Sequence, residues 1–243
     1  MQRLDRKELA ESVGAAIQPA DAPPGGFAMV NRERARPIDL PPWFIDRCRQ
    51  AYLSINFDDE DGNRIIAVSS AQHGAGKTSV AVGIATAIAV DTADKTLLIE
   101  CDFASQIGFD ALFDLRPGPG LCEWLEIGGH LRIIQGSPIF VLPTGDPGPD
   151  PSRMMYRIGE MDLLSAFRPH FRNIVVDLPP LLNIAYASLA TKIADHVLLV
   201  ARYGVTALDD LERAVFLLGR ERLAGIVLNA HDPKTPSWLQ RLI

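Results

Sequence analysis

The sequence predicts an α/β fold, with a doubly wound, mostly parallel sheet flanked by helices. Short runs rich in Ile, Val and Leu recur along the chain, as expected for strands that are buried on both faces. Between several of these runs lie segments with apolar residues at helical spacing, so strands and helices alternate as in βαβ units. A length of 243 residues is sufficient for one such domain with tails.

The expected elements begin with a helix over 44–57, followed by a strand over 64–69. A glycine-bearing turn leads into a buried helix over 78–90, which has apolar residues at helical spacing with small residues between them. Further strands are expected at 96–100, 139–142, 173–177, 196–201 and 224–229. All of these strands are short apolar runs of the kind found in parallel sheets.

The last helix is expected between the final two strands. Thr206 is predicted to cap it, with Asp209 three residues later as in a capping box. Gly219 is predicted to end it. Its apolar stripe is expected to consist of Leu208, Leu211, Val215 and Leu218.

The chain divides into three expected segments. Residues 1–42 combine a short helical patch with many prolines and glycines, a composition that buries too little apolar surface to offset chain entropy. We expect a flexible N-terminal leader there, with a docking segment that folds on a partner as the alternative. Residues 43–231 are expected to form the α/β domain, and residues 232–243 a short C-terminal tail.

Composition narrows the class of function. Apolar residues make up 47% and charged residues 22% of the chain, which is ordinary for a globular protein. A net charge of −6 argues against nucleic acid as the partner, because phosphate backbones require clustered Lys and Arg. The three cysteines form no C-x-x-C pair, and neither a signal peptide nor an apolar run of ~20 residues is present. We therefore expect a cytoplasmic protein.

The segment from Ala71 to Thr78 has the composition of a phosphate-binding loop, and it lies between an expected strand and an expected helix. Gly74 and Gly76 allow the backbone to turn its N–H groups inward around an anion. The following helix points the positive end of its dipole at the same place. Ala71 replaces the first glycine of the usual pattern, so the alternative is a glycine-rich turn with an incidental lysine.

This loop predicts ATP and Mg²⁺ as cofactors. Lys77 is expected to reach the β- and γ-phosphates, and the hydroxyl of Thr78 to bind Mg²⁺. The residues that we expect to surround the cofactor in this part of the chain are Gly74, Ala75, Gly76, Lys77, Thr78 and Ser79.

Carboxylates follow two of the expected strands. Glu100 and Asp102 come after the run 97–99, and Asp177 comes after the run 174–176. Because ligands bind at the carboxyl ends of the strands in open α/β sheets, these side chains are expected beside the loop. Their hard oxygen atoms suit Mg²⁺. Asp102 and Asp177 are therefore predicted, with Thr78, as the metal-binding residues.

Several motifs occur in a characteristic order along the chain: 74–78, 98–102, 113–121, 141–145, 176–180, 200–204 and 225–229. In this order they resemble the bacterial tyrosine autokinases (BY-kinases) of capsule and exopolysaccharide assembly. That family belongs to the deviant-Walker P-loop ATPases, a group that also includes plasmid-partitioning and division-site proteins. The likeness extends from about Ile45 to Asn229, which is most of the chain.

The resemblance implies an ATP-binding protein-tyrosine kinase or ATPase that serves exopolysaccharide synthesis or export. It implies a membrane polysaccharide co-polymerase or chain-length regulator as the partner, and hence a peripheral position at the inner face of the membrane. A homo-oligomer is also implied. The catalytic residues implied are Lys77, Glu100, Asp102 and Asp177, and Asn229 would contact the adenine edge.

The chain departs from the family at several places, among them residues 103–106, where an Arg-Pro pair is common in the family. The first acidic residue of the second motif is Glu100, where the family has an aspartate. Asp46, Arg49 and Tyr52 occupy the positions of the family's Glu-x-x-Arg-x-x-Arg assembly motif. The family's tyrosine-rich tail is absent, because the tyrosines are Tyr52, Tyr156, Tyr186 and Tyr203. Autophosphorylation on such a tail is therefore not expected.

Two further functions stay open. The same fold could serve as a catalytically weak, nucleotide-dependent regulator, as Glu100 and the missing tail indicate. It could also serve as a positioning ATPase of the partitioning type. Gln72 counts against that third function, because it occupies the position where the partitioning branch needs a lysine.

Overall fold

The structure is a computed structural model, which describes residues 34–55, 57, 63–105, 107–116, 118–127, 131–160, 164, 167–194 and 196–230. The first 33 residues of the expected leader and the whole of the expected C-terminal tail lie outside this part of the chain. None of the helices described combines the length and the hydropathy that crossing a bilayer requires.

The described residues form one eight-stranded sheet in the order β1-β4-β5-β3-β6-β2-β7-β8. All neighbours from β5 to β8 in this order pair in parallel. Strand β4 pairs antiparallel with β5, and β1 pairs parallel with β4. The strands are β1 Arg34–Ala35, β2 Arg64–Ser70, β3 Thr96–Glu100, β4 Arg132–Ile134, β5 Ile139–Leu142, β6 Asn173–Asp177, β7 His196–Arg202 and β8 Leu223–Asn229. The predicted, mostly parallel α/β fold is confirmed.

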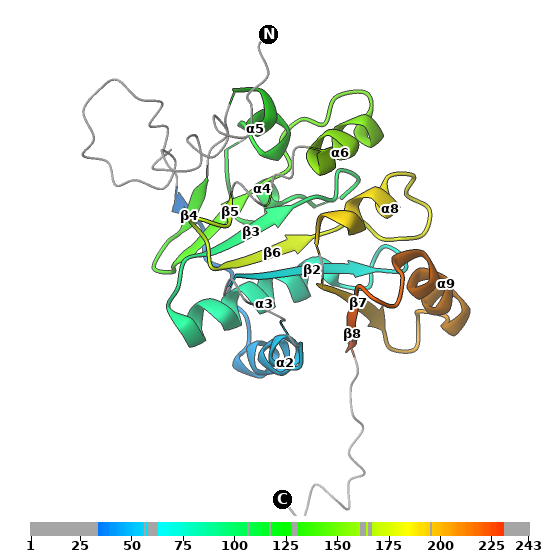
Figure 1. The fold of residues 1–243 in the computed structure, drawn as a ribbon. Coiled ribbons are helices and arrows are strands. Elements are labelled where there is room, and N and C mark those ends of the chain that lie inside the picture. The colour runs from blue at the N-terminus through cyan, green and yellow to red at the C-terminus, as the bar shows by residue number, and fades with distance from the viewer. Residues whose placement is uncertain are drawn as a thin grey trace, which may run out of the picture.

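Helices cover both faces of the sheet (Figure 1). One face carries α2 (Pro42–Leu53), α3 (Lys77–Thr92) and α4 (Phe109–Leu112). The opposite face carries α5 (Leu121–Ile127), α6 (Pro151–Glu160), α8 (Ala187–Ala190) with the 3₁₀ turn η1 (Thr191–Ile193), and α9 (Leu208–Leu218). In Figure 1 the arrowheads of β2, β3 and β6 point to the side on which α8 and α9 lie.

Each central strand contributes to two hydrophobic cores. In β2, Ile65 and Ala67 pack on the face of α5, α6, α8 and α9, whereas Ile66 and Val68 pack on the face of α2 and α3. Alternate residues point to opposite faces of a strand, and here both faces are covered. This explains why the strands read as continuous apolar runs, and why three of them have the predicted bounds.

Two helix predictions need correction. Helix α2 starts at Pro42 and ends at Leu53 instead of spanning 44–57, since proline is well suited to the first turn of a helix. Helix α9 begins at Leu208 with Ala207 as its N-cap and no side-chain cap. Thr206 does not cap it, because its hydroxyl accepts a hydrogen bond from the Arg202 N–H at 2.8 Å.

The apolar stripe of α9 also differs from the prediction at one position. Leu208 is 68% exposed, whereas Ala214 and Leu218 are buried and Leu211 and Val215 pack partly against the core. The predicted end of the helix is correct, because Gly219 follows the last turn with a φ of +85°. A left-handed φ of this kind favours glycine.

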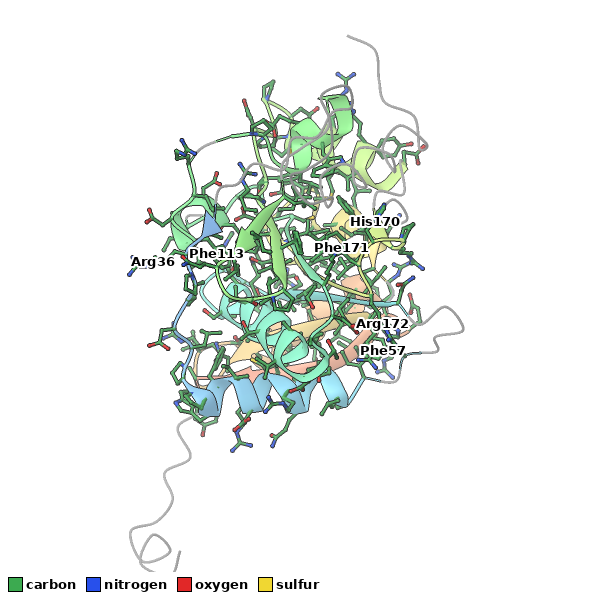
Figure 2. The ribbon with its side chains drawn as sticks, turned by 90° about the vertical axis from the view of Figure 1, so that its left-hand side faces the viewer. Arg36, Phe57, Phe113, His170, Phe171 and Arg172 are labelled. Atoms are coloured by element: carbon green, nitrogen blue, oxygen red, sulfur yellow. The ribbon has the colours of Figure 1, made fainter. Side chains whose placement is uncertain are left out.

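The sequence did not predict β1 and β4, which have two and three residues. Arg34 lies in register with Ile133 of β4. The adjacent Arg36 N–H donates to the Phe113 carbonyl at 2.8 Å, and Figure 2 shows the two residues near each other. Residues 34–36 of the expected leader therefore belong to the folded domain.

Two of the three assembly-motif positions, Arg49 and Tyr52, hold helix α2 against α3. Arg49 forms an ion pair with Asp91 of α3, with 2.8 Å between Nε and Oδ1, and a second one with Asp46. The Tyr52 hydroxyl donates to the same Asp91. These three side chains thus contact their own chain in the structure, and a homo-oligomer stays a prediction.

Candidate nucleotide-binding site

The loop between β2 and α3 has the backbone conformation that its glycines predict. Gly74 and Gly76 have φ angles of +80° and +87°, and Gly76 is the N-cap of α3. A Cβ atom at Gly76 would lie 2.2 Å from Asn229 Nδ2, whereas one at Gly74 would meet nothing within 4 Å. Position 76 therefore favours glycine for its left-handed conformation, and a side chain there would also displace the Asn229 amide. Position 74 borders open space at the N-terminus of α3, where an anion is favoured.

Neighbouring segments hold the loop in place. The Leu181 N–H donates to the Ser70 carbonyl at 2.8 Å, which ties the start of the loop to the segment after β6. The Gln72 amide donates to Asp210 Oδ2 of α9 at 2.6 Å. The sequence did not predict this second contact. Its partners lie 138 residues apart, and no sequence motif links Gln72 with Asp210.

Four of the predicted site residues meet at the carboxyl ends of β3 and β6. Lys77 Nζ lies 2.9 Å from Asp102 Oδ2 and 3.1 Å from Asp177 Oδ1. The Thr78 hydroxyl donates to Asp177 Oδ2 at 2.7 Å. Lys77, Asp102 and Asp177 are 7%, 3% and 0% exposed. The structure thus brings a lysine, a hydroxyl and two carboxylates together beside the glycine loop.

Burial and charge oppose each other in this cluster. Burial alone would lower the pKa of the Lys77 ammonium, but the charges of Asp177 and Asp102, with their hydrogen bonds, raise it overall. The lysine therefore stays protonated. Burial also raises the pKa of Asp177, and the charge of Lys77 and the hydrogen bonds from Thr78 and Lys77 offset this only in part.

Glu100 is buried next to the cluster, and its carboxylate has other partners. Oε1 accepts a hydrogen bond from the Phe109 N–H at 3.0 Å, and Oε2 accepts one from the Thr144 N–H at 3.2 Å. Burial raises the pKa of Glu100 to about 7, although these hydrogen bonds act to lower it. The carboxylate thus joins two loops at the end of β3, and its predicted catalytic role stays a prediction.

The remaining predicted residues lie on the loop or beside it. Asn229, at the end of β8, donates from Nδ2 to the Ala75 carbonyl at 2.8 Å, so it holds the loop against β8. Its predicted contact with adenine stays a prediction. Ser79 is exposed in the first turn of α3. Thr144, which bonds Glu100, lies in the 141–145 motif but was not predicted as a site residue.

The residues present fit a nucleotide phosphate and Mg²⁺. The Thr78 hydroxyl and the carboxylates of Asp102 and Asp177 are hard oxygen donors, which Mg²⁺ prefers. The N-terminus of α3 and the Lys77 ammonium supply positive charge for an anion at the open side of the loop.

Comparisons with known proteins agree with this geometry. No family model matches the chain. Among curated proteins, it is 27% identical over 198 residues to the tyrosine-protein kinase CpsD of Streptococcus pneumoniae serotype 4, covering 78% of this chain and 87% of CpsD. It is 29% identical over 214 residues to the tyrosine-protein kinase Etk of Escherichia coli K12, covering 82% of this chain. The chain is thus similar to bacterial tyrosine kinases over most of its length.

The chain also resembles solved structures. It aligns with the kinase domain of Escherichia coli tyrosine kinase Etk with a TM-score of 0.59 and 25% identity, over 70% of this chain and 69% of that domain. The fold is shared with septum site-determining protein MinD of Pyrococcus horikoshii, solved with Mg-ADP, at a TM-score of 0.58 and 19% identity over 74% of this chain and 77% of MinD. The chain spans only 29% of full-length Etk and 26% of the putative tyrosine-protein kinase EpsB of Ralstonia solanacearum.

Proposed function

We propose that this chain binds Mg·ATP at residues 71–78 and acts as a BY-kinase-like protein in exopolysaccharide or capsule biosynthesis or export. The observation that carries the proposal is the buried cluster of Lys77, Thr78, Asp102 and Asp177 beside the glycine loop. In open α/β sheets ligands bind at this end of the strands. The tyrosine kinases CpsD and Etk among its relatives support the reaction class.

Each residue has a role that its position allows. The backbone of Gly74, Ala75 and Gly76 and the Lys77 ammonium would hold the phosphates, through N–H donors and positive charge. Thr78, Asp102 and Asp177 would hold Mg²⁺, directly or through water. When bound, Mg²⁺ offsets the negative charge of the phosphates. MinD of Pyrococcus horikoshii, which has the same fold, was solved in complex with Mg-ADP.

We further propose a membrane co-polymerase or chain-length regulator as the partner, which would place the chain at the inner face of the membrane. The tyrosine-protein kinases CpsD and Etk among the similar proteins support this choice of partner, because the resemblance is to kinases of capsule and exopolysaccharide assembly. Co-purification with such a membrane protein would test this arrangement.

Calorimetric titration of Mg·ATP tests nucleotide binding. We expect the wild-type protein to bind ATP and Lys77→Ala to bind at least about tenfold more weakly, because a charge-assisted contact to phosphate is lost. Lys95→Ala is the matched control, since Lys95 is exposed just before β3, at the opposite end of the sheet. Undetectable binding by the wild type, or unchanged affinity in Lys77→Ala, would overturn the proposal.

A nucleotide-dependent regulator is the second candidate. The contacts of Glu100 with Phe109 and Thr144 favour this second function. Glu100 is a predicted catalytic residue, but its carboxylate binds the backbone of two loops. A phosphotyrosine immunoblot after incubation with Mg·ATP separates the two functions. Strong tyrosine labelling by the wild type, lost in Lys77→Ala, would reject the regulator.

A further inference from the structure

Lys77 contacts every residue that is predicted to bind Mg²⁺. Its Nζ lies 2.9 Å from Asp102 Oδ2, 3.1 Å from Asp177 Oδ1 and 3.4 Å from Thr78 Oγ1. The ammonium therefore lies among the oxygen atoms that would surround a divalent cation. A lysine that binds phosphate must point out of this cluster instead.

The charges explain why the lysine lies there. The side chains of Asp102 and Asp177 are each only 1% exposed, and a buried carboxylate without a counter-charge is strongly unfavourable. The Lys77 ammonium supplies that counter-charge in the protein without nucleotide. A divalent cation entering beside it would meet a positive charge at short range, where repulsion is large.

We propose that Lys77 occupies the divalent-cation site of the nucleotide-free protein, so that Mg²⁺ binds only with a nucleotide that draws the lysine onto its phosphates. This inference rests on the proposed function, because it takes Thr78, Asp102 and Asp177 as the cation ligands. It gives Lys77 two alternating sets of partners, the carboxylates and the phosphates. Removal of the ammonium then opens a cation site that the wild-type chain keeps closed.

The test uses Mn²⁺ as the probe and full-length protein without nucleotide. Bound Mn²⁺ is measured by the loss of the paramagnetic resonance signal of the free ion. We expect Lys77→Met to bind one Mn²⁺ on the order of a hundredfold more tightly than the wild type, because the competing charge is gone. Adding Asp177→Asn should abolish this binding, and Lys95→Met should behave as the wild type does.

The inference is overturned if the wild type and Lys77→Met bind Mn²⁺ equally without nucleotide, whether both bind it tightly or neither binds it. If Lys77→Met folds only with Mn²⁺ and not with a chelator, that dependence supports the inference. If Lys77→Met folds in neither condition, Mn²⁺ binding by the wild-type protein tests the inference. Mn²⁺ bound without nucleotide then contradicts the inference, and Mn²⁺ bound to the protein only after ADP is added supports it.

Failure of the proposed function would look different. In that case the wild type would not bind ATP in the calorimeter, whatever its Mn²⁺ titration shows. The comparison of the wild type with Lys77→Met contains no nucleotide, so it reports on the Lys77 cluster alone.

Discussion

At the scale of single residues, Glu100 shows what a motif can and cannot predict. The sequence correctly placed a carboxylate at the end of β3, together with the neighbouring Asp102 that pairs with Lys77. It could not predict that Glu100 binds the N–H groups of Phe109 and Thr144, which lie 9 and 44 residues away. Those partners depend on how two loops fold back over the sheet, and no local pattern encodes that path.

The raised pKa of Glu100 predicts how stability depends on pH. Its folded value of about 7 lies above the ordinary value of 4.5, so its contribution to stability is fully present below pH ~4.5 and is lost as pH rises through ~7. We expect the unfolding free energy of the wild type, relative to that of Glu100→Gln, to fall by about 2 kcal/mol from pH ~5 to pH ~8. Urea denaturation at both pH values measures it.

Glu123→Gln is the matched control for that measurement. Like Glu100, Glu123 accepts hydrogen bonds from two backbone N–H groups, those of Gly120 at 2.7 Å and Asp146 at 2.8 Å. Its side chain is only half-buried, so the control reports the loss of an acceptor without deep burial. A difference for Glu100→Gln that stays constant with pH would show that its folded and unfolded pKa values are alike.

At the scale of elements, the strength of the local pattern decided which predictions succeeded. Strands β3, β5 and β6 have the predicted bounds, because helices on both faces make each of them a continuous apolar run. Strands β1 and β4 and helices α4 and α8, with two to four residues each, were not predicted, unlike the four-residue β5, whose residues are all apolar. Such segments are too short to show a period, and they form because longer neighbours offer pairing or packing partners.

The packing of α2 on α3 predicts an unusual effect of a glycine substitution. A Cβ atom at Gly83 of α3 would lie 2.5 Å from Cys48 Sγ and 2.8 Å from the Phe44 ring of α2. We expect Gly83→Ala to destabilise the protein by about 1–3 kcal/mol in urea denaturation, because overpacking outweighs the gain in helix propensity. Adding Cys48→Ala should restore part of the loss, since the nearest clash is removed.

Gly159 of α6 provides the control, because a Cβ atom there would meet nothing within 4 Å. Gly159→Ala should therefore stabilise the protein by roughly 0.5–1 kcal/mol, the usual gain on replacing an exposed helical glycine. If both alanine variants stabilise the protein alike, α2 does not press on Gly83 in solution.

At the scale of the whole molecule, topology assembled most of the predicted site. Lys77 and Thr78, Asp102, and Asp177 come from three segments, and they meet because β6 pairs in parallel with both β2 and β3. The meeting of these residues follows from an alternating α/β pattern, since the carboxyl ends of parallel strands all lie at the same end of the sheet. The Gln72–Asp210 contact does not follow from it, because the rotation of α9 over the sheet is set by packing.

The whole fold also limits which tyrosines can be phosphorylated. Tyr52 and Tyr186 are 3% and 6% exposed, whereas Tyr156 and Tyr203 are each 55% exposed. We expect phosphate, added by this chain or by another tyrosine kinase, to reach Tyr156 and Tyr203 but not Tyr52 and Tyr186, because a core side chain cannot enter a second active site while its own domain stays folded. Mass spectrometry of the treated protein locates the phosphate, and protein unfolded in urea before treatment and then diluted serves as the accessible reference. Phosphate on Tyr52 or Tyr186 of the folded protein would show that the α2 side or the α8 side of the sheet opens before the domain as a whole unfolds.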